Sequence, residues 1–400
     1  MNSKSRLAVV VSHPIQYYAP LFRTLARRCE LEVFYAFQPS PDQLGAVDFG
    51  KAFSWDVDLL EGYSSTFLTN VSTRPGTSDS AGCDTPEIGR HLRDGNFDAV
   101  LIFGWYLKSY RQALLAAKRH GLPALVRGDS NLAMPASPVK RLAKAIANPP
   151  FLRLFDRALY VGERSRAFYR HYRYPDCRLF FSPHCVDNDW FAARTKPAER
   201  QRMREELGIA DDAFVVLFAG KLIKRKRPLD AVKALAMCQT QGRKVALLVA
   251  GSGVLENAIR TEAQAAGLPH YMLGFCNQTE MPPAYAASDV LILPSDGSET
   301  WGLVANEAMA CGKPVIVSDA CGCAPDLAAD GAAGRMVAVG DVAGLAAAIV
   351  SVMDDPPTQW AIAERIAHYS LDSAADGVLQ ALETLPRRHR PLKPVGNGSC

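Results

Sequence analysis

The chain has 400 residues, of which 48% are hydrophobic and 22% are charged, and its net charge is +4. This length allows two domains of ordinary size, each with its own core. The small net charge gives no reason to expect a nucleic-acid partner. No apolar run reaches the roughly 18 residues expected of a membrane span. The ten cysteines include no Cys-x-x-Cys pair, as in reduced proteins, so we expect a cytoplasmic protein.

Strand-like apolar runs alternate with helix-like segments through the first half. Strands are predicted at 7–11, 31–35, 99–103, 124–126, 158–161 and 179–181. Helices are predicted at 20–28, 109–120 and 163–172, the first with a proline well placed in its first turn. The Ser/Thr/Gly-rich stretch 61–86 shows little periodicity and is predicted to be a loop over the first domain.

The second half repeats this alternation. Strands are predicted at 214–219, 245–250, 271–273, 290–293 and 315–317, and helices at 229–237, 255–266 and 304–310. Continuous apolar runs are typical of buried parallel strands, and their alternation with helices indicates doubly wound α/β sheets. We therefore expect two Rossmann-like domains that face each other across a cleft.

The expected boundary divides the chain into residues 1–187 and 188–369. The expected connection is 182–200, which contains two prolines and no clear period. The segment 358–385 is predicted to be helical, and a C-terminal helix at about 370–390 is expected to pack back on the first domain. The Pro/Gly-rich tail 391–400 is expected to be mobile.

Two carboxylates, Glu299 and Glu307, lie eight residues apart, with Gly302 between them. Glu299 follows an apolar strand and Glu307 falls in the first turns of the next helix. Ligands of open α/β sheets bind at such edges, and helix N-termini attract phosphate. The spacing predicts a site for a phosphorylated, hydroxyl-rich ligand, with the backbone of Gly302 and Leu303 facing the phosphate.

Basic residues follow the strand 214–219. Lys221 and Lys226 are five residues apart, close enough to hold one diphosphate from two sides of a loop. A solvated basic loop is the alternative. The segment 251–253 begins like a dinucleotide fingerprint, but Glu256 stands where the third glycine would be. That departure argues against a dehydrogenase.

The run from Glu299 to Glu307 resembles the Glu-x7-Glu motif of retaining glycosyltransferases with the GT-B fold, in the large family four of nucleotide-sugar transferases. The segments 218–226, 273–275, 285–290, 294–295 and 307–315 resemble that family in the same order, and the likeness covers residues 180–345. It implies transfer of a sugar from a nucleoside diphosphate donor, UDP- or GDP-linked, to a hydroxyl of a glycan or glycolipid acceptor.

The resemblance also implies roles for single residues. Lys221 and Lys226 would hold the diphosphate, supported by the backbone of Gly302 and Leu303. Glu307 would bind the ribose, and Glu299 would orient the donor sugar. Lys221 stands where arginine is more usual, which keeps the charge but loses the bidentate fork. No cofactor other than the donor substrate is implied.

The first half supplies two further candidates, His13 and Asp129. His13 lies between the first strand and the first helix, in a segment (12–17) that resembles the openings of bacterial surface-polysaccharide transferases. Asp129 follows the strand 124–126, where many family members have a histidine. It would bind a donor-sugar hydroxyl or the acceptor; a helix-cap or turn role is the alternative.

We expect no metal in the site. The pairs Asp56/Asp58 and Asp187/Asp189 match the Asp-x-Asp pattern of GT-A transferases, but neither follows a clear buried strand, and the lysines already supply positive charge. Residues 138–178 hold ten Lys/Arg against three Asp/Glu and several apolar side chains. They would form either a peripheral contact with the inner face of the membrane or ordinary solvated helices.

Two other functions share the expected architecture. A nucleotide-sugar 2-epimerase would lack an acceptor surface. A non-catalytic nucleotide-sugar-binding protein would have lost the lysines or the glutamates, all of which are present here.

Overall fold

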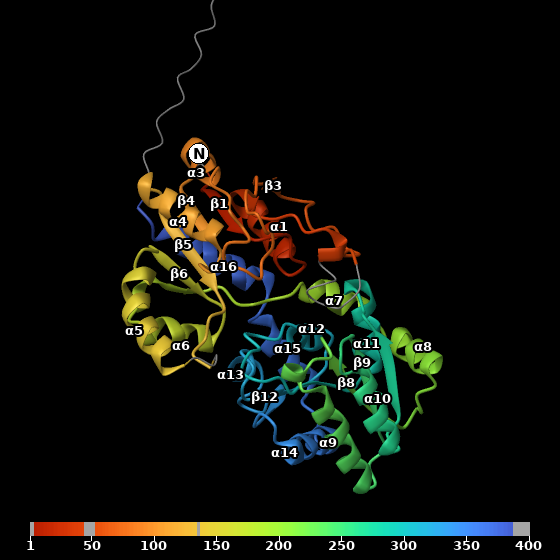
Figure 1. Cartoon of the computed structure of the whole chain (residues 1–400). Helices are drawn as coiled ribbons and strands as arrows, with labels where there is room; N and C mark the ends of the chain where they lie inside the picture. Colours follow the sequence, from red (N-terminus) through yellow and green to blue (C-terminus); the bar gives the residue numbers. More distant parts are fainter. Residues whose placement is uncertain (1–3, 44–52, 134–136, 387–400) are drawn as a thin grey trace, which may run out of the picture.

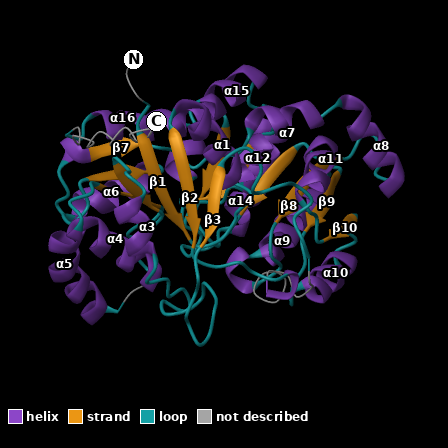
Figure 2. Ribbon diagram, turned by 90° about the horizontal axis from the view of Figure 1, so that it is seen from above, coloured by secondary structure: helices purple, strands orange, loops and turns teal. Residues whose placement is uncertain are grey.

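The computed structural model describes residues 4–43, 53–133 and 137–386. Within these residues each half of the chain forms one parallel sheet with helices on both faces (Figure 1). Seen from above, the strands form two separate groups (Figure 2). The predicted α/β class with two Rossmann-like sheets is confirmed.

The first sheet has seven strands in the order β3-β2-β1-β4-β5-β6-β7. The interior strand β1 is buried on both faces, as its unbroken apolar sequence predicts. The strands are β1 (Arg6–Val11), β2 (Glu30–Tyr35), β3 (Ser64–Phe67), β4 (Ala99–Ile102), β5 (Ala124–Gly128), β6 (Arg157–Tyr160) and β7 (Leu179–Phe181).

Helices cover both faces of this sheet. One core cluster joins it to α1 and α16, and another joins it to α3, α4 and α6. The helix α16 comes from the end of the chain and contacts α1, β6 and β7. The helices are α1 (Tyr18–Arg28), α3 (Ile88–Asp94), α4 (Lys108–Arg119), α5 (Pro138–Leu152), α6 (Glu163–His171) and α16 (Leu371–Glu383), with a short 3-10 turn η1 (Asp176–Arg178) before β7.

The second sheet has six strands in the order β10-β9-β8-β11-β12-β13. The strands are β8 (Phe214–Ala219), β9 (Val245–Ala250), β10 (His270–Gly274), β11 (Val290–Leu293), β12 (Val315–Ser318) and β13 (Gly334–Val337). The helices around it are α7 (Asn188–Arg194), α8 (Pro197–Leu207), α9 (Pro228–Thr240), α10 (Glu256–Ala265), α11 (Met281–Ala287), α12 (Val304–Ala310), α13 (Ala324–Leu327), α14 (Val342–Asp354) and α15 (Gln359–Ala367), with 3-10 turns η2 (Lys224–Lys226) and η3 (Gln278–Glu280).

Three predicted segments are wrong in detail. The predicted loop 61–86 contains β3, which pairs with β2 at the edge of the first sheet. The predicted connection 182–200 contains α7 and the start of α8. The predicted helix 358–385 is two helices, because Ser370 ends the continuous pattern and caps α16 by accepting a hydrogen bond from the Ser373 N–H. The predicted tail 391–400 lies outside the described residues.

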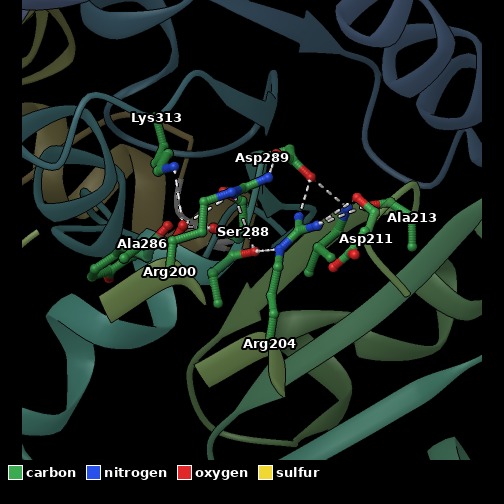
Figure 3. A network of polar contacts seen from close by, with 11 residues as sticks. Arg200, Arg204, Asp211, Ala213, Ala286, Ser288, Asp289 and Lys313 are labelled. Carbon is green, nitrogen blue, oxygen red and sulfur yellow. Dashed lines mark hydrogen bonds and ion pairs between the residues drawn. The ribbon is translucent and has the colours of Figure 1, made fainter. Parts of the chain in front are cut away.

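A buried polar network fixes α8 on the second domain (Figure 3). Arg204 donates to the Ala287 carbonyl at 2.9 Å and to the Asp289 carboxylate at 2.8 Å. Arg200 donates to the other oxygen of Asp289 at 2.7 Å. The same carboxylate accepts the N–H of Val215 in β8. Asp289 therefore joins α8 to the strand that leads into the candidate site.

Among the described residues, no helix has the combined length and apolar character needed to cross a bilayer.

Candidate functional site

A pocket of about 100 Å³ lies at the carboxyl ends of β8, β9 and β10, the edge where open α/β sheets bind ligands. Both domains line it. The first domain contributes Gln16, Tyr17 and Trp55. The second domain contributes small residues at the ends of β8 and β9, the side chains of Phe275 and Met281, and the carboxylate of α12; the small residues are Ala219, Gly220, Ala250 and Gly251, and the carboxylate is that of Glu307.

Glu307 is buried at one end of this pocket, with 4% of its surface exposed. Its carboxylate accepts a hydrogen bond from Tyr17 Oη at 2.7 Å and another from Tyr285 Oη at 2.6 Å. Burial raises the pKa of Glu307 to about 7, although both hydroxyls favour the ionised form. Each carboxylate oxygen thus accepts one tyrosine hydroxyl and keeps a further lone pair to which a ligand hydroxyl can donate.

Glu299 lies in the loop before α12 and pairs with Lys226 of η2. Both side chains are largely buried, with 14% and 15% exposed. The backbone ties the two loops together, because the Asp296 N–H donates to the Arg225 carbonyl at 2.9 Å. Lys226 and Glu299 therefore place a cation and an anion side by side beyond the ends of β8 and β11.

Gly302 turns the chain between the two glutamates with φ of +101°. A Cβ at this position would lie 2.4 Å from Leu293 Cδ2, so no other residue fits without movement. Leu303 follows as the N-cap of α12, and its carbonyl accepts the Glu307 N–H at 3.0 Å. The glycine thus lets one short segment carry Glu299 in a loop and Glu307 in a helix.

The glycines at 251 and 253 have a packing explanation. A Cβ on Gly251 would lie 1.9 Å from the Gly220 carbonyl oxygen, and one on Gly253 would lie 2.7 Å from that of Leu222. The Leu222 N–H donates to the Ser252 carbonyl at 2.9 Å. This close approach holds the loop that carries Lys221, between Gly220 and Leu222, against its neighbour.

Asp129 lies at the end of β5 beside a second hollow of about 190 Å³ in the first domain. His184 Nε2 is 3.9 Å from its carboxylate. Burial works against ionisation of Asp129, but the adjacent His184 and Thr300 outweigh it and hold its pKa below the usual range. The hollow is rich in aromatic side chains: Tyr18, Phe103, Trp105, Tyr106 and Tyr110.

His13 lies in the β1–α1 loop, where its Nδ1 is 2.9 Å from Ser12 Oγ. The same loop carries Gln16 and Tyr17 to the Glu307 pocket. His13 itself lines neither that pocket nor the hollow beside Asp129. The structure therefore brings Glu299 and Lys226 into contact and groups Glu307 with Tyr17, but it does not bring His13 and Asp129 together at one of these hollows.

The Asp-x-Asp pairs hold backbone and side-chain hydrogen bonds. Asp56 accepts from the Thr279 N–H at 2.9 Å, and Asp58 accepts from two backbone N–H groups of the next turn. Asp187 caps α7. In the described part of the chain no three His, Cys, Asp or Glu side chains come together as a metal-binding group.

Four side chains that contact Glu307, Asp129 or the pocket were not predicted as site residues: Tyr17, Trp55, His184 and Tyr285. Tyr17 could have been suspected, because it falls in the segment 12–17 that contains the candidate His13. Trp55 lies in a stretch without periodicity, and His184 lies in the predicted connection. No signal in the sequence singles out either residue.

Known proteins agree with this architecture. The model of the family "Glycosyl transferases group 1" matches residues 199–369. A D-inositol 3-phosphate glycosyltransferase of Actinosynnema mirum is 30% identical over 318 residues, which cover 72% of each chain. A GDP-mannose-dependent phosphatidylinositol monomannoside mannosyltransferase of Mycolicibacterium smegmatis is 29% identical, over 54% of this chain and 58% of the relative. Other matches are shorter: one relative from Catenulispora acidiphila, 33% identical, is covered over 40% of its length by 41% of this chain.

Solved structures show the same fold at low identity. The Anabaena protein HepE in complex with UDP has a TM-score of 0.72 and 18% identity, covering 95% of this chain and all of that one. WaaG, a glycosyltransferase involved in lipopolysaccharide biosynthesis, has a TM-score of 0.60 and 18% identity, covering 94% and 98%. The predicted GT-B architecture and the resemblance to nucleotide-sugar glycosyltransferases are confirmed, and the chain belongs to the group 1 glycosyl transferases.

Proposed function

We propose that the protein transfers a sugar from a nucleoside diphosphate donor to a hydroxyl of a glycan or glycolipid. The observation that carries the proposal is the buried Glu307 carboxylate in the lining of a pocket on the carboxyl edge of the second sheet, where each oxygen accepts one tyrosine hydroxyl and keeps a further lone pair for a ligand hydroxyl. The name of the M. smegmatis relative specifies a GDP-mannose donor, and HepE was solved with UDP.

In this proposal the donor lies along the β8–β11 edge. Glu307 binds the ribose diol. Lys221 and Lys226, with the backbone of Gly302 and Leu303, hold the diphosphate and stabilise the charge that develops on the leaving group. Glu299 turns from its ion pair with Lys226 to the hydroxyls of the donor sugar. The donor is UDP- or GDP-linked, no metal or other cofactor takes part, and the anomeric configuration is retained.

The acceptor site in this proposal is the aromatic hollow beside Asp129. Aromatic rings present flat apolar faces, and a neighbouring carboxylate accepts hydroxyl protons; together they suit a sugar ring. Asp129 binds a hydroxyl of the acceptor or of the donor sugar. His13, in the β1–α1 loop, contributes a polar group to the site from the first domain.

We also propose that the first domain rests on the inner face of the cytoplasmic membrane through α5. Val139, Leu142 and Ile146 follow one another at helical spacing and are 78%, 65% and 69% exposed. The helix carries three basic residues and no acidic one, and it lies on the outer side of the first domain (Figure 1). An exposed apolar stripe beside basic residues suits an anionic bilayer.

Vesicle co-sedimentation tests the membrane contact. With anionic lipid the protein should sediment, and Leu142→Asp should release it, since it places a charge in the apolar stripe. Leu115→Asp, at a 66% exposed position on α4, is the matched control and should still sediment. Equal sedimentation of both variants, or none with the unaltered protein, would exclude this surface.

A donor screen tests the activity. UDP- and GDP-sugars are incubated with candidate glycan and glycolipid acceptors, and the products are identified by mass spectrometry and NMR, with and without a chelator. Transfer with retained configuration supports the proposal. Conversion of the nucleotide sugar without an acceptor would indicate an epimerase, and binding without any turnover would indicate a non-catalytic protein.

A further inference from the structure

A short segment of the first domain, residues 53–58, lies directly on the second domain beside the Glu307 pocket. We call it the clasp. The Phe53 ring packs against Phe275, with centroids 4.7 Å apart. The Ser54 carbonyl accepts from Asn277 Nδ2 at 2.7 Å, and the Asp56 carboxylate accepts from the Thr279 N–H at 2.9 Å. The clasp thus contacts both the loop after β10 and the turn η3.

The clasp is tied to the first domain at its other end. Arg23 of α1 donates to the Asp58 and Glu61 carbonyls, the latter at 2.9 Å. The Asp58 carboxylate accepts the N–H groups of Leu60 and Glu61 at 2.8 and 3.0 Å, which fixes the turn. Because Arg23 belongs to α1, these hydrogen bonds attach the clasp to the first domain.

The surface of the second domain that the clasp contacts is held in shape by hydrogen bonds of its own. Asn277 caps η3, and the Glu280 side chain accepts the Asn277 N–H in return, at 2.6 Å. This capping box orients Asn277 and exposes the Thr279 N–H at the start of the turn. The contact with the clasp therefore joins two local structures that hold their own shape.

Trp55 projects from the middle of the clasp into the pocket lining. Its ring meets Phe53 at a centroid distance of 5.1 Å. The same pocket is lined by small residues at the ends of β8 and β9, by the Phe275 ring and by Glu307. A lining of an indole, a phenyl ring and exposed backbone beside a carboxylate suits a planar heteroaromatic ring that carries polar groups.

We propose that the clasp completes the binding site for the donor's base, with Trp55 as the residue that the base contacts and the Asp56–Thr279 hydrogen bonds as the latch that holds Trp55 in place. This rests on the proposed function, since it assigns a base-recognition role to the first domain within the same site. Base affinity then depends on residues of both domains and on their closed arrangement.

Calorimetry with UDP, GDP and inorganic pyrophosphate tests the assignment. Base stacking on an aromatic side chain contributes about 1–3 kcal/mol, so Trp55→Ala should weaken binding of the preferred nucleotide by about 5- to 140-fold. Trp55→Phe should recover part of that loss. Pyrophosphate, which lacks a base, should bind the unaltered protein and Trp55→Ala equally. Trp360→Ala, at a 72% exposed tryptophan of α15, is the matched control and should leave nucleotide affinity unchanged.

A second substitution tests the latch, the hydrogen bonds between Asp56 and Thr279. Asp56→Ala removes the acceptor for Thr279 but keeps the Trp55 indole and the clasp contacts of Phe53 and Ser54, so nucleotide affinity should fall by less than in Trp55→Ala and pyrophosphate affinity should not change. If the unaltered protein binds UDP or GDP and Trp55→Ala binds it equally well, the clasp has no part in base recognition. If the unaltered protein binds neither nucleotide, the proposed function itself fails.

Discussion

Replacing Gly302 by alanine should destabilise the second domain for two separable reasons. The residue has φ of +101°, a conformation that costs a residue with a Cβ about 1–3 kcal/mol. The new Cβ would also lie 2.4 Å from Leu293 Cδ2 on β11, and moving a packed leucine costs about 1–3 kcal/mol more. The sum, about 2–6 kcal/mol, is a large part of the stability of an ordinary domain.

Gly331→Ala provides the matched control. Gly331 lies in the same domain with φ of +74°, but a Cβ there would have no heavy atom within 4 Å. It therefore carries the backbone strain without the clash. Each kcal/mol lowers the Tm of a domain of 150–250 residues by about 2–4 °C. Calorimetry should show the second-domain transition of Gly302→Ala about 2–12 °C below that of Gly331→Ala.

The contact with Leu293 can be tested directly. Leu293→Val removes the atom that the new Cβ would meet, so Gly302→Ala combined with Leu293→Val should lose less stability than the two single losses added together. The nucleotide affinity of Gly302→Ala should fall as well, because the same turn places Glu299 and Glu307. Equal Tm values for the two glycine variants, with additive losses in the double variant, would refute the close-packing argument.

Three further changes test other parts of the site. Lys226→Met should weaken the binding of a nucleoside diphosphate about tenfold or more, because it removes a contact with the phosphates, and should leave the affinity for the nucleoside unchanged. Calorimetry with both ligands checks this, and an equal loss of affinity for the two would show that the lysine acts only through folding. Arg204→Ala should lower the free energy of unfolding by about 3 kcal/mol, because it leaves Asp289 short of a buried partner, whereas Arg202→Ala, 58% exposed, should change it by less than about 1 kcal/mol in urea titrations. The folded-state pKa of Glu307, about 7, lies above the ordinary 4.5, so its stabilising contribution is complete below pH 4.5 and is lost as the pH rises through about 7. Unfolding of Glu307→Gln should therefore lack this loss, and identical pH profiles for the variant and the unaltered protein would contradict the raised pKa.

The two sheets could be predicted because their central strands are buried on both faces and so appear as unbroken apolar runs. The edge strand β3 could not, since its sequence Ser64-Ser-Thr-Phe67 has one apolar residue and it depends on pairing with β2. The bounds of α7 and α8 were missed because two prolines suggested a loop, whereas Pro197 takes the first-turn position that a helix tolerates.

Part of the candidate site could be predicted from the sequence and part could not. Glu299, Gly302 and Glu307 lie within nine residues and could be predicted from spacing and local structure. The partner of Glu307 could not, since Tyr17 is 290 residues away and meets it only when the domains pack together. The pairing of Lys226 with Glu299, and the position of Trp55, likewise follow from long-range packing, which leaves no periodic signal in the sequence.

The contacts between the two domains differ in the free energy that it takes to break them. The buried Asp326 carboxylate accepts from the Glu163 N–H of the first domain at 3.0 Å and from Tyr369 Oη of its own domain at 2.9 Å. Trp301 packs so tightly against the first domain that a Cβ on Gly162 would meet its ring at 2.3 Å. The clasp's hydrogen bonds from Asn277 and Thr279, by contrast, are exposed to water. Water replaces exposed hydrogen bonds at little net cost, whereas separating buried polar partners costs about 1–3 kcal/mol each. The clasp hydrogen bonds should therefore break at a lower free-energy cost than the Asp326–Glu163 contact or the hydrogen bond from Tyr17 to the buried Glu307, which lines the same pocket as Trp55.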